Sequence, residues 1–309
     1  MKMALIKDGN SGNMRPVEPE HYVGRAPNSS LRIDDRLISA QHALLRWTGQ
    51  FWELRDLGSR NGTYLDGVRL KPGEEHRVVK GMRMSFGVPD PRWELVDDAP
   101  PWAMVVPWDG STAIPLEDDM IALPSAEDPR LTIYRGAGGW VLERPDESIT
   151  PIANLQTFDV GGRVWRFCCL DEVAKTSLGE GVPAEMDVQH LRLTFFVSRD
   201  EENVMVHAQL GGRVVDMGTR AYYYLLLTLA RRRLEDVAEG VPETSCGWMY
   251  VDDLAMGESG SVPQVNIEVF RLRKHFRSVG VEDAASIVER RPRTRQLRIG
   301  AQSIHIVRI

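Results

Sequence analysis

Apolar and polar residues alternate in short runs over the first third of the chain, which is the period of half-buried β-strands. Gly, Ser, Asn and Asp residues lie between these runs and indicate turns. The runs are Leu44–Trp47, Trp52–Leu57, Arg77–Val79, Arg83–Phe86 and Trp93–Val96. Because Asp97–Pro101 has the composition of a linker, the pattern predicts a first β-domain over residues 1–97.

Three of the predicted loops carry side chains that suit a phosphorylated ligand. Phosphothreonine has about −1.5 to −2 charges and three acceptor oxygens, so its site needs a fixed cation and neutral donors. Arg25 provides a planar, always charged fork of donors, and Ser39 provides a hydroxyl. Asn61 provides an amide that donates and accepts, and the following Gly62 places it at a turn. We therefore expect these loops to bind phosphate.

The order and spacing of Gly24-Arg25, Ser39-Ala40-Gln41-His42 and Ser59-Arg60-Asn61-Gly62 resemble the forkhead-associated (FHA) domain, a phosphothreonine-binding β-sandwich. The resemblance covers about the first third of the chain. It implies that the phosphothreonine-binding residues are Arg25, Ser39, Arg60 and Asn61. It also implies that Leu37 sets the preference for a peptide residue downstream of the phosphothreonine.

Two further positions matter in this comparison. In the family the equivalent of His42 supports the loops, so the resemblance implies a structural role for it. Ala40 replaces a polar residue that often reaches the bound peptide, which reduces the contacts we expect.

The middle segment, residues 102–178, resembles a degenerate copy of the first domain. Arg130–Glu143 parallels Ala43–Leu54, because both place a Gly turn between two strands and a Trp in the second strand. The segment lacks the Gly-Arg, Ser-x-x-His and Asn-Gly motifs at the matching places. We expect either a second FHA-like β-sandwich that does not bind phosphate or an unrelated β-domain.

The pattern changes to mixed strands and helices over residues 186–309. Leu191–Val197 and Asn203–Ala208 alternate as a hairpin, and Thr219 is expected to cap a helix that runs to about Val237. A short helix is expected at Trp248–Ala255. Ser261-Val262-Pro263-Gln264 forms a capping box with Pro in the first turn and opens a third helix that ends at Gly280.

The residue pattern of the third helix predicts one buried face and one polar face. At 100° per residue, one apolar stripe comprises Val265, Val269, Leu272, Phe276 and Val279. A hairpin with a basic tip follows at residues 286–299. This arrangement resembles the winged helix-turn-helix output domain of bacterial response regulators, above all over residues 265–274. It implies a DNA-binding third helix and wing formed by Asn266, Phe270, Arg271, Lys274, Arg277, Arg291, Arg293 and Arg295.

The same helix face allows a second interpretation. Ile267 and Phe270 lie among the predicted DNA-contacting residues, where polar or basic residues are commoner. An apolar side chain contacts a thymine methyl group in some complexes, but a mixed apolar and basic face also suits a protein partner. The alternative is an adaptor that binds no DNA and docks a protein through this face.

The distribution of charge agrees with either interpretation. The net charge of the 309 residues is −6. Residues 265–309 carry ten Lys or Arg and four Asp or Glu, a net charge of +6, so the preceding residues carry −12. Such asymmetry is typical of nucleic-acid contact at the basic end, although a basic surface also docks acidic partners.

The sequence gives no support for an enzyme, a metal-binding protein or a membrane protein. We find no phosphate loop, no zinc-protease or nucleophile-elbow motif, and no Cys-x-x-Cys, so we expect no enzyme, metal site or cofactor. Three cysteines make no disulfide framework, and the start of the chain has no apolar leader, so we expect a cytoplasmic protein without a membrane span.

The sequence thus predicts a multidomain chain, mainly β, with an α+β C-terminal domain. Its predicted function is phosphothreonine-dependent signalling, as a transcription regulator that binds a phosphorylated protein, such as a Ser/Thr kinase or its substrate, and duplex DNA. The oligomeric state is left open.

Overall fold

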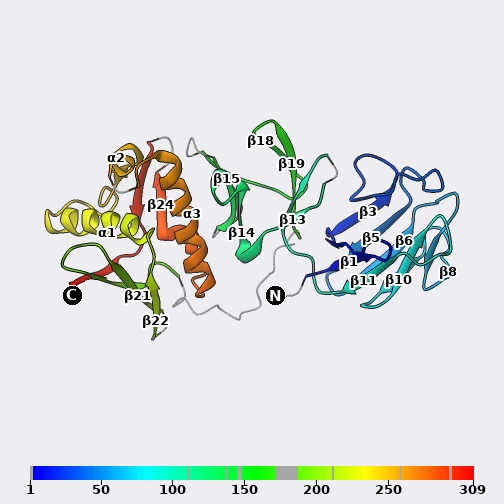
Figure 1. Ribbon diagram of the computed structural model, residues 1–309, viewed down its shortest axis with the longest axis horizontal. Coiled ribbons are helices and arrows are strands. Elements are labelled where there is room, and N and C mark those ends of the chain that lie inside the picture. The colour runs from blue at the N-terminus through cyan, green and yellow to red at the C-terminus, as the bar shows by residue number, and fades with distance from the viewer. Residues whose placement is uncertain are drawn as a thin grey trace. The chain divides into compact units, whose positions relative to one another are not determined.

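The computed structural model describes residues 3–109, 111–136, 138–144, 148–170, 187–210, 212–257, 259–291 and 294–309. These residues form two compact units, shown as ribbons in Figure 1. As far as the residues are described, unit 1 spans Met1–Leu116 and Ala153–Val173. Unit 2 spans Glu117–Ile152 and Ala174–Ile309.

Two packed sheets form the N-terminal part of unit 1. Their strand orders are β2-β1-β11-β10-β7-β8 and β4-β3-β5-β6-β9. The strands are β1 Leu5–Asp8, β2 Met14–Pro16, β3 Glu20–Gly24, β4 Leu31–Arg32, β5 Ala43–Trp47, β6 Trp52–Asp56, β7 Thr63–Leu65, β8 Val68–Arg69, β9 Glu75–Val78, β10 Arg83–Phe86 and β11 Trp93–Asp97. The strands predicted at Arg83–Phe86 and Trp93–Val96 are therefore confirmed, the second with one added residue.

The core of this sandwich contains side chains from both sheets. Ile6 and Leu95 come from the first sheet, and Leu45, Trp52 and Leu54 come from the second. All five are at most 2% exposed. Each buried side chain of this size stabilises the fold by about 1.5 to 3 kcal/mol, so the alternating pattern fixes which face of each strand points inward.

The middle segment is divided between the two units. Unit 1 holds a sheet of order β13-β12-β19-β18, with β12 Met104–Pro107, β13 Ile114–Pro115, β18 Thr157–Val160 and β19 Arg163–Cys168. An ion pair of 2.8 Å between Arg166 Nη2 and Glu18 Oε2 links β19 to the N-terminal sandwich. Unit 2 holds a sheet of order β14-β15-β16-β17. This division differs from the predicted boundary at residues 102–178, and a second FHA-like sandwich stays a prediction.

The described residues of unit 2 form three sheets and three α-helices. The strands are β14 Met120–Ser125, β15 Asp128–Gly136, β16 Gly139–Glu143, β17 Ile149–Pro151, β20 Arg192–Val197, β21 Val204–Leu210, β22 Arg213–Thr219, β23 Met249–Tyr250, β24 Val288–Arg291, β25 Gln296–Ile299 and β26 Ser303–Arg308. The helices are α1 Tyr223–Ala238, α2 Val251–Met256 and α3 Val262–Ser278, with single 3-10 turns at Glu117–Asp119 and Ala284–Ile287. None of the described helices is both long and apolar enough to cross a bilayer.

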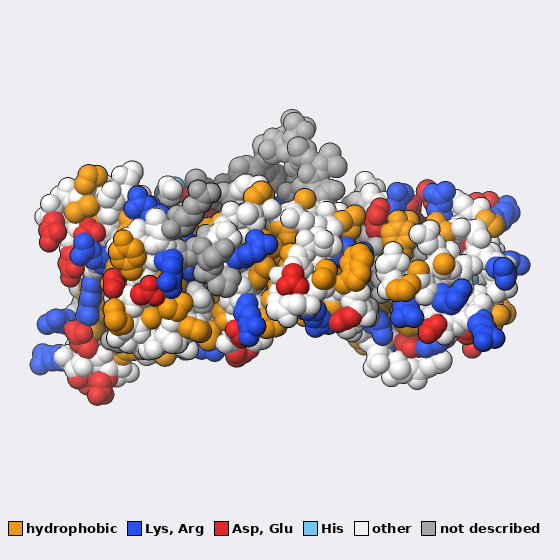
Figure 2. Space-filling view, turned by 90° about the horizontal axis from the view of Figure 1, so that it is seen from above, with side chains coloured by type: hydrophobic (Ala, Val, Ile, Leu, Met, Phe, Trp, Pro, Cys, Tyr) orange, Lys and Arg blue, Asp and Glu red, His pale blue; other side chains and the backbone are white. Residues whose placement is uncertain are grey.

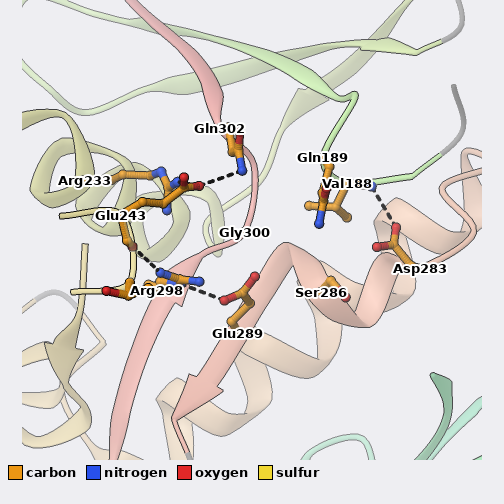
Figure 3. Close-up of a pocket in the computed structure, with 11 residues that line it drawn as sticks. Val188, Gln189, Arg233, Glu243, Asp283, Ser286, Glu289, Arg298, Gly300 and Gln302 are labelled. Atoms are coloured by element: carbon orange, nitrogen blue, oxygen red, sulfur yellow. Dashed lines mark hydrogen bonds and ion pairs between the residues drawn. The ribbon is translucent and has the colours of Figure 1, made fainter. Parts of the chain in front are cut away.

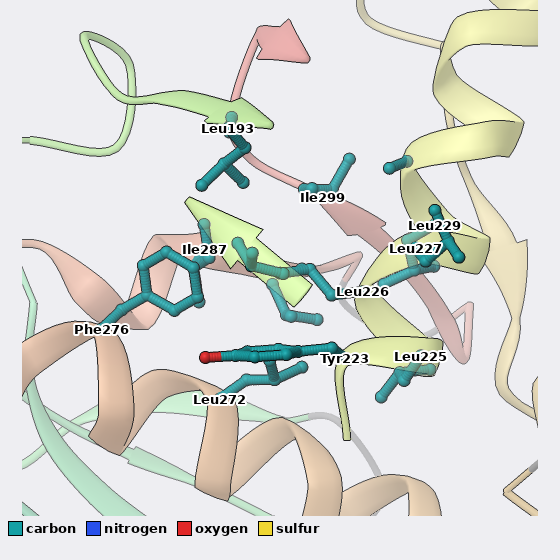
Figure 4. Packing of buried hydrophobic residues seen from close by; sticks show 14 of the residues in the cluster. Leu193, Tyr223, Leu225, Leu226, Leu227, Leu229, Leu272, Phe276, Ile287 and Ile299 are labelled. Atoms are coloured by element: carbon teal, nitrogen blue, oxygen red, sulfur yellow. The ribbon is translucent and has the colours of Figure 1, made fainter. Parts of the chain in front are cut away.

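The core of unit 2 forms where α1 and α3 pack on the β-strands. Figure 4 shows Tyr223 of α1 lying against Leu272 and Phe276 of α3, and all three belong to one buried cluster. The Tyr223 hydroxyl donates to the carbonyl oxygen of Met217 at 3.1 Å, so the buried phenol is satisfied. This packing confirms the predicted apolar stripe of the third helix at these positions.

The helix starts were predicted with mixed success. Ser261 caps α3 as expected, because its side chain accepts a hydrogen bond from the Gln264 N–H at 3.3 Å. The expected cap at Thr219 is wrong: Thr219 ends β22, and α1 begins after Tyr222, which makes no side-chain cap bond. The register of β21 with β22 continues to Thr219, so sheet pairing outweighs its capping tendency. The predicted order of three helices followed by the β24–β25 hairpin is present.

Within unit 2, the β14–β17 sheet packs on α3 through a buried ionic cluster. Glu143 is 5% exposed and lies between two arginines. Its Oε2 is 2.9 Å from Arg273 Nη1, and its Oε1 is 2.6 Å from Arg290 Nε. The Tyr134 hydroxyl donates to the same carboxylate at 3.1 Å. Burial alone would raise the pKa of Glu143, but the two guanidinium groups outweigh it and hold this pKa below its usual value.

Replacing Glu143 by Ala should destabilise unit 2 by about 3 to 5 kcal/mol, because two buried guanidinium groups lose their counter-charge. Urea unfolding followed by circular dichroism measures the change. Glu127→Ala, at an exposed turn of the same sheet, is the matched control and should leave stability nearly unchanged. Equal midpoints for the two variants would show that the cluster contributes little.

The same cluster predicts a dependence on pH. The folded pKa of Glu143 lies below the ordinary value of 4.5, so its stabilising effect is complete above that pH and is lost as the pH falls through the lower folded value. The difference in unfolding free energy between the wild type and Glu143→Gln should therefore be constant near neutral pH and shrink in acid. A difference that grows on acidification contradicts this assignment.

Candidate functional site

Gly24 ends β3, and Arg25 begins the first of the three predicted loops. The Arg25 N–H donates to the carbonyl oxygen of Ser39 at 2.9 Å, which joins this loop to the one before β5. A Cβ atom at Gly24 would lie 2.2 Å from the carbonyl oxygen of Ala40, so only glycine allows the two loops to approach so closely. The Gly-Arg motif therefore has a packing reason as well as a chemical one.

His42 links the second loop to the third. Its Nδ1 accepts a hydrogen bond from the Ser39 N–H at 3.1 Å, and its Nε2 is 3.0 Å from the carbonyl oxygen of Gly62. These partners require the neutral ring with the proton on Nε2. Burial lowers the pKa of His42, despite the opposing effects of the Gly62 carbonyl and of Asp56. The ring is a neutral support for the loops, as the resemblance implied.

Asp56, at the end of β6, organises the third loop. Its carboxylate accepts hydrogen bonds from the N–H groups of Gly58 and Ser59, each at 2.9 Å. It also accepts hydrogen bonds from the hydroxyls of Ser59 and Thr63, each at 2.6 Å. Burial raises the pKa of Asp56, but these donors outweigh it and the net pKa is lowered. Sequence reasoning missed this role, because an acidic residue after a strand is a common turn residue.

The predicted phosphothreonine-binding residues meet where the three loops converge. The Arg60 N–H donates to Ser39 Oγ at 3.1 Å, which leaves the hydroxyl proton of Ser39 to donate elsewhere. Asn61 Nδ2 donates to the carbonyl oxygen of Leu37 at 2.8 Å. Together with the Arg25 to Ser39 bond, these contacts bring the backbones of all five predicted positions into one rim.

The cations of this rim are available to a ligand. The side chains of Arg25 and Arg60 are exposed, and neither forms an ion pair within the described part of the chain. Arg69 of β8 is a third basic residue there: a Cβ at Gly62 would lie 2.5 Å from its Nε, so its guanidinium covers the glycine next to Asn61. Sequence reasoning missed Arg69, because Val68-Arg69 has no distinctive pattern.

Most of the predicted DNA-contacting residues of α3 already have partners within unit 2. Phe270 is 6% exposed and packs with Met120, Ala122 and Tyr134. Lys274 Nζ is 3.7 Å from Glu117 Oε2, and Arg277 pairs with Asp119. Asn266 accepts a hydrogen bond from Arg290 at 2.8 Å, whereas Arg271 is exposed. The structure therefore covers most of this face with carboxylates and apolar groups.

The predicted wing residues are more accessible. Arg291 and Arg295 are exposed; Arg291 lies over the Trp248 ring at 5.5 Å, and Arg295 Nη2 is 3.0 Å from Asp252 Oδ1. Arg293 lies outside the described residues. Figure 2 shows basic and acidic side chains interspersed on the face that it presents, without one broad basic field.

A separate pocket of about 320 Å³ lies in unit 2. Each of its charged side chains has a hydrogen-bond partner within the protein, and Figure 3 shows Asp283 accepting from the backbone N–H of Val188, at 2.7 Å. Arg298 Nε donates to Glu289 at 2.7 Å, and Gln302 Nε2 donates to Glu243 at 2.7 Å. Since its charged side chains already have partners within the protein, we assign this pocket no ligand.

Comparison with known proteins supports the N-terminal assignment. The family model for the FHA domain matches residues 21–87. FhaB of Mycobacterium tuberculosis is 39% identical over 67 residues, which is 22% of this chain and 38% of that protein. GarA, the glycogen accumulation regulator of Mycolicibacterium smegmatis, is 32% identical over 85 residues, which is 25% of this chain and 54% of that protein. The chain thus spans well under two thirds of these relatives.

Solved structures show likeness over a similar share of the chain. Mycobacterium tuberculosis EmbR in complex with a low-affinity phosphopeptide covers 32% of this chain and 25% of its own, with 22% identity and a TM-score of 0.29. A structure from a study of phosphothreonine-dependent FHA domain interactions covers 31% of this chain and 90% of its own, with 25% identity and a TM-score of 0.25.

The family match falls on the three loops and strands that carry Arg25, Ser39, Arg60 and Asn61. Residues 21–87 of this chain are an FHA domain.

Proposed function

We propose that this chain is a phosphothreonine-dependent signalling protein that binds a phosphorylated segment of a Ser/Thr kinase or of a kinase substrate. One observation carries the proposal: Arg25 and Arg60 are exposed and unpaired among the described residues, beside the Ser39 hydroxyl and the Asn61 amide. An open pair of guanidinium groups beside neutral donors matches the charge and the three acceptor oxygens of a phosphothreonine.

The roles of the individual residues follow from their chemistry. Arg25 forms charge-assisted bonds to the phosphate, the Ser39 hydroxyl donates to it, and Arg60 adds a second cation. Asn61, held by the Leu37 carbonyl, offers its remaining groups to the peptide backbone. Leu37 is 45% exposed, so it is free to contact a residue downstream of the phosphothreonine.

For the C-terminal domain, the exposed surface favours the adaptor over the transcription regulator in the state described. Phe270, Lys274 and Arg277 already have partners within unit 2. A duplex needs these groups on an open face. The order of α1, α2, α3 and the β24–β25 hairpin keeps duplex DNA as a second candidate, for a state in which α3 is uncovered.

Arg25→Ala should weaken the binding of phosphothreonine peptides by at least about tenfold, because charge-assisted bonds to phosphate are lost. A degenerate peptide library with one fixed phosphothreonine supplies ligands for fluorescence anisotropy with the full chain. Arg83→Ala, which removes an exposed arginine from β10, is the matched control and should bind like the wild type. Equal affinity for the library and its unphosphorylated copy would refute the proposed function.

A further inference from the structure

Three basic residues of α3 form ion pairs with carboxylates from one short stretch of the chain. Lys274 faces Glu117, Arg277 faces Asp119, and Arg273 faces Glu143. All three carboxylates come from residues 117–143, which bring the β14–β16 strands and the turn before them onto the helix. Figure 1 shows α3 in orange beside the green strands β14 and β15. The contacts therefore form a complementary surface and not a scatter of single pairs.

The middle of this surface is largely apolar and buried. Phe270 packs with Met120, Ala122 and Tyr134, and all four side chains are at most 7% exposed. The Arg273 guanidinium lies 5.1 Å from the centre of the Tyr134 ring. A helix face with an apolar centre and cations around it is also the face that the sequence predicts for contact with DNA.

The contacts become weaker toward the edge. The side chains of Lys274 and Glu117 are 43% and 67% exposed, and those of Arg277 and Asp119 are 25% and 34% exposed. Exposed ion pairs contribute little to stability, so the pairs at this edge open readily to solvent. Arg271 is exposed beside these edge pairs and forms no ion pair among the described residues.

The choice of residues argues against an interface that is only structural. Replacing a buried ion pair by apolar residues of similar volume is often neutral or stabilising, so stability alone does not demand Glu143, Arg273 and Arg290. A helix face that binds phosphates requires cations, and any part of the chain that packs over such a face requires carboxylates to neutralise them.

We propose that the β14–β17 sheet, together with the 3-10 turn at Glu117–Asp119, is a cover in cis for α3, and that moving it away uncovers a surface for duplex nucleic acid. The carboxylates of the cover take the contacts that phosphates make on the open helix. This inference goes beyond phosphothreonine binding, and it holds or fails independently of the FHA domain.

Two variants loosen the cover without altering α3. Ala122→Trp places a large neutral side chain on the edge strand β14 where Ala122 packs on Phe270, so overpacking forces the sheet away. Glu117→Gln/Asp119→Asn removes the carboxylates of the edge pairs. Glu202→Gln/Glu239→Gln removes two exposed charges elsewhere in unit 2 and controls for net charge. The probe is a labelled random-sequence duplex, titrated in fluorescence anisotropy with the full chain, while hydrogen exchange reports opening of residues 117–143.

Ala122→Trp should bind the duplex at least about tenfold more tightly than the wild type. This binding should weaken as salt rises, because log Kd increases by about 0.9 per phosphate contact for each unit of log salt concentration. Adding Arg271→Ala/Lys274→Ala should abolish the gain. The proposal is overturned if hydrogen exchange shows that Ala122→Trp is open and this variant binds the duplex no more tightly than the wild type. It is also overturned if the wild type itself binds the duplex tightly. If Ala122→Trp fails to fold, the Glu117→Gln/Asp119→Asn variant decides: it should bind more tightly than its charge control, and equal affinity overturns the cover.

Discussion

A buried guanidinium must have a counter-charge, and this constraint shapes unit 2. Arg273 is 2% exposed and Glu143 is 5% exposed, so neither tolerates the loss of the other. Because Glu143 ends β16 and Arg273 lies within α3, their contact fixes how the β14–β17 sheet sits on the helix. Arg290 completes the cluster from β24, so one carboxylate joins the sheet, the helix and the hairpin. The cover of α3 follows from this arrangement.

Two arginines at the rim of the FHA domain contrast with those of α3. Arg25 and Arg60 are exposed, and the two ionisable residues that support their loops are neutral or already hydrogen bonded. The His42 ring is neutral, and both of its nitrogens form hydrogen bonds. The Asp56 carboxylate accepts hydrogen bonds from donors of its own loop. The rim is therefore rigid in its backbone and open in its cations, which is what a preorganised phosphate site requires.

The sequence predicted the parts of the structure that depend on local signals. The Ser261 cap, the apolar stripe of α3 and the strands β10 and β11 follow from periodicity and capping chemistry. The convergence of Ser39 with Arg60 and of Leu37 with Asn61 was implied by the ordered loop motifs. Thr219 misled because a residue that suits a helix cap also suits a strand end, and pairing with β21 decided between them.

Other features had no local signal. The partners of Arg273 and Arg277 lie 130 and 158 residues away along the chain, and nothing in the charge pattern selects Glu143 or Asp119 from the other acidic residues. A face that looked open in the sequence is covered in the fold for this reason. Asp56 was missed because its role depends on four donors that only the folded loop brings together.

We expect the chain to offer phosphate-binding cations at its FHA rim and to withhold those of α3. The most direct test measures the binding of two ligands to this 309-residue chain at one near-physiological salt concentration. The ligands are a degenerate phosphothreonine peptide library and a random-sequence duplex. We expect saturable, phosphate-dependent peptide binding and little duplex binding. Strong duplex binding, together with peptide binding that does not depend on the phosphate, would show that both assignments are wrong.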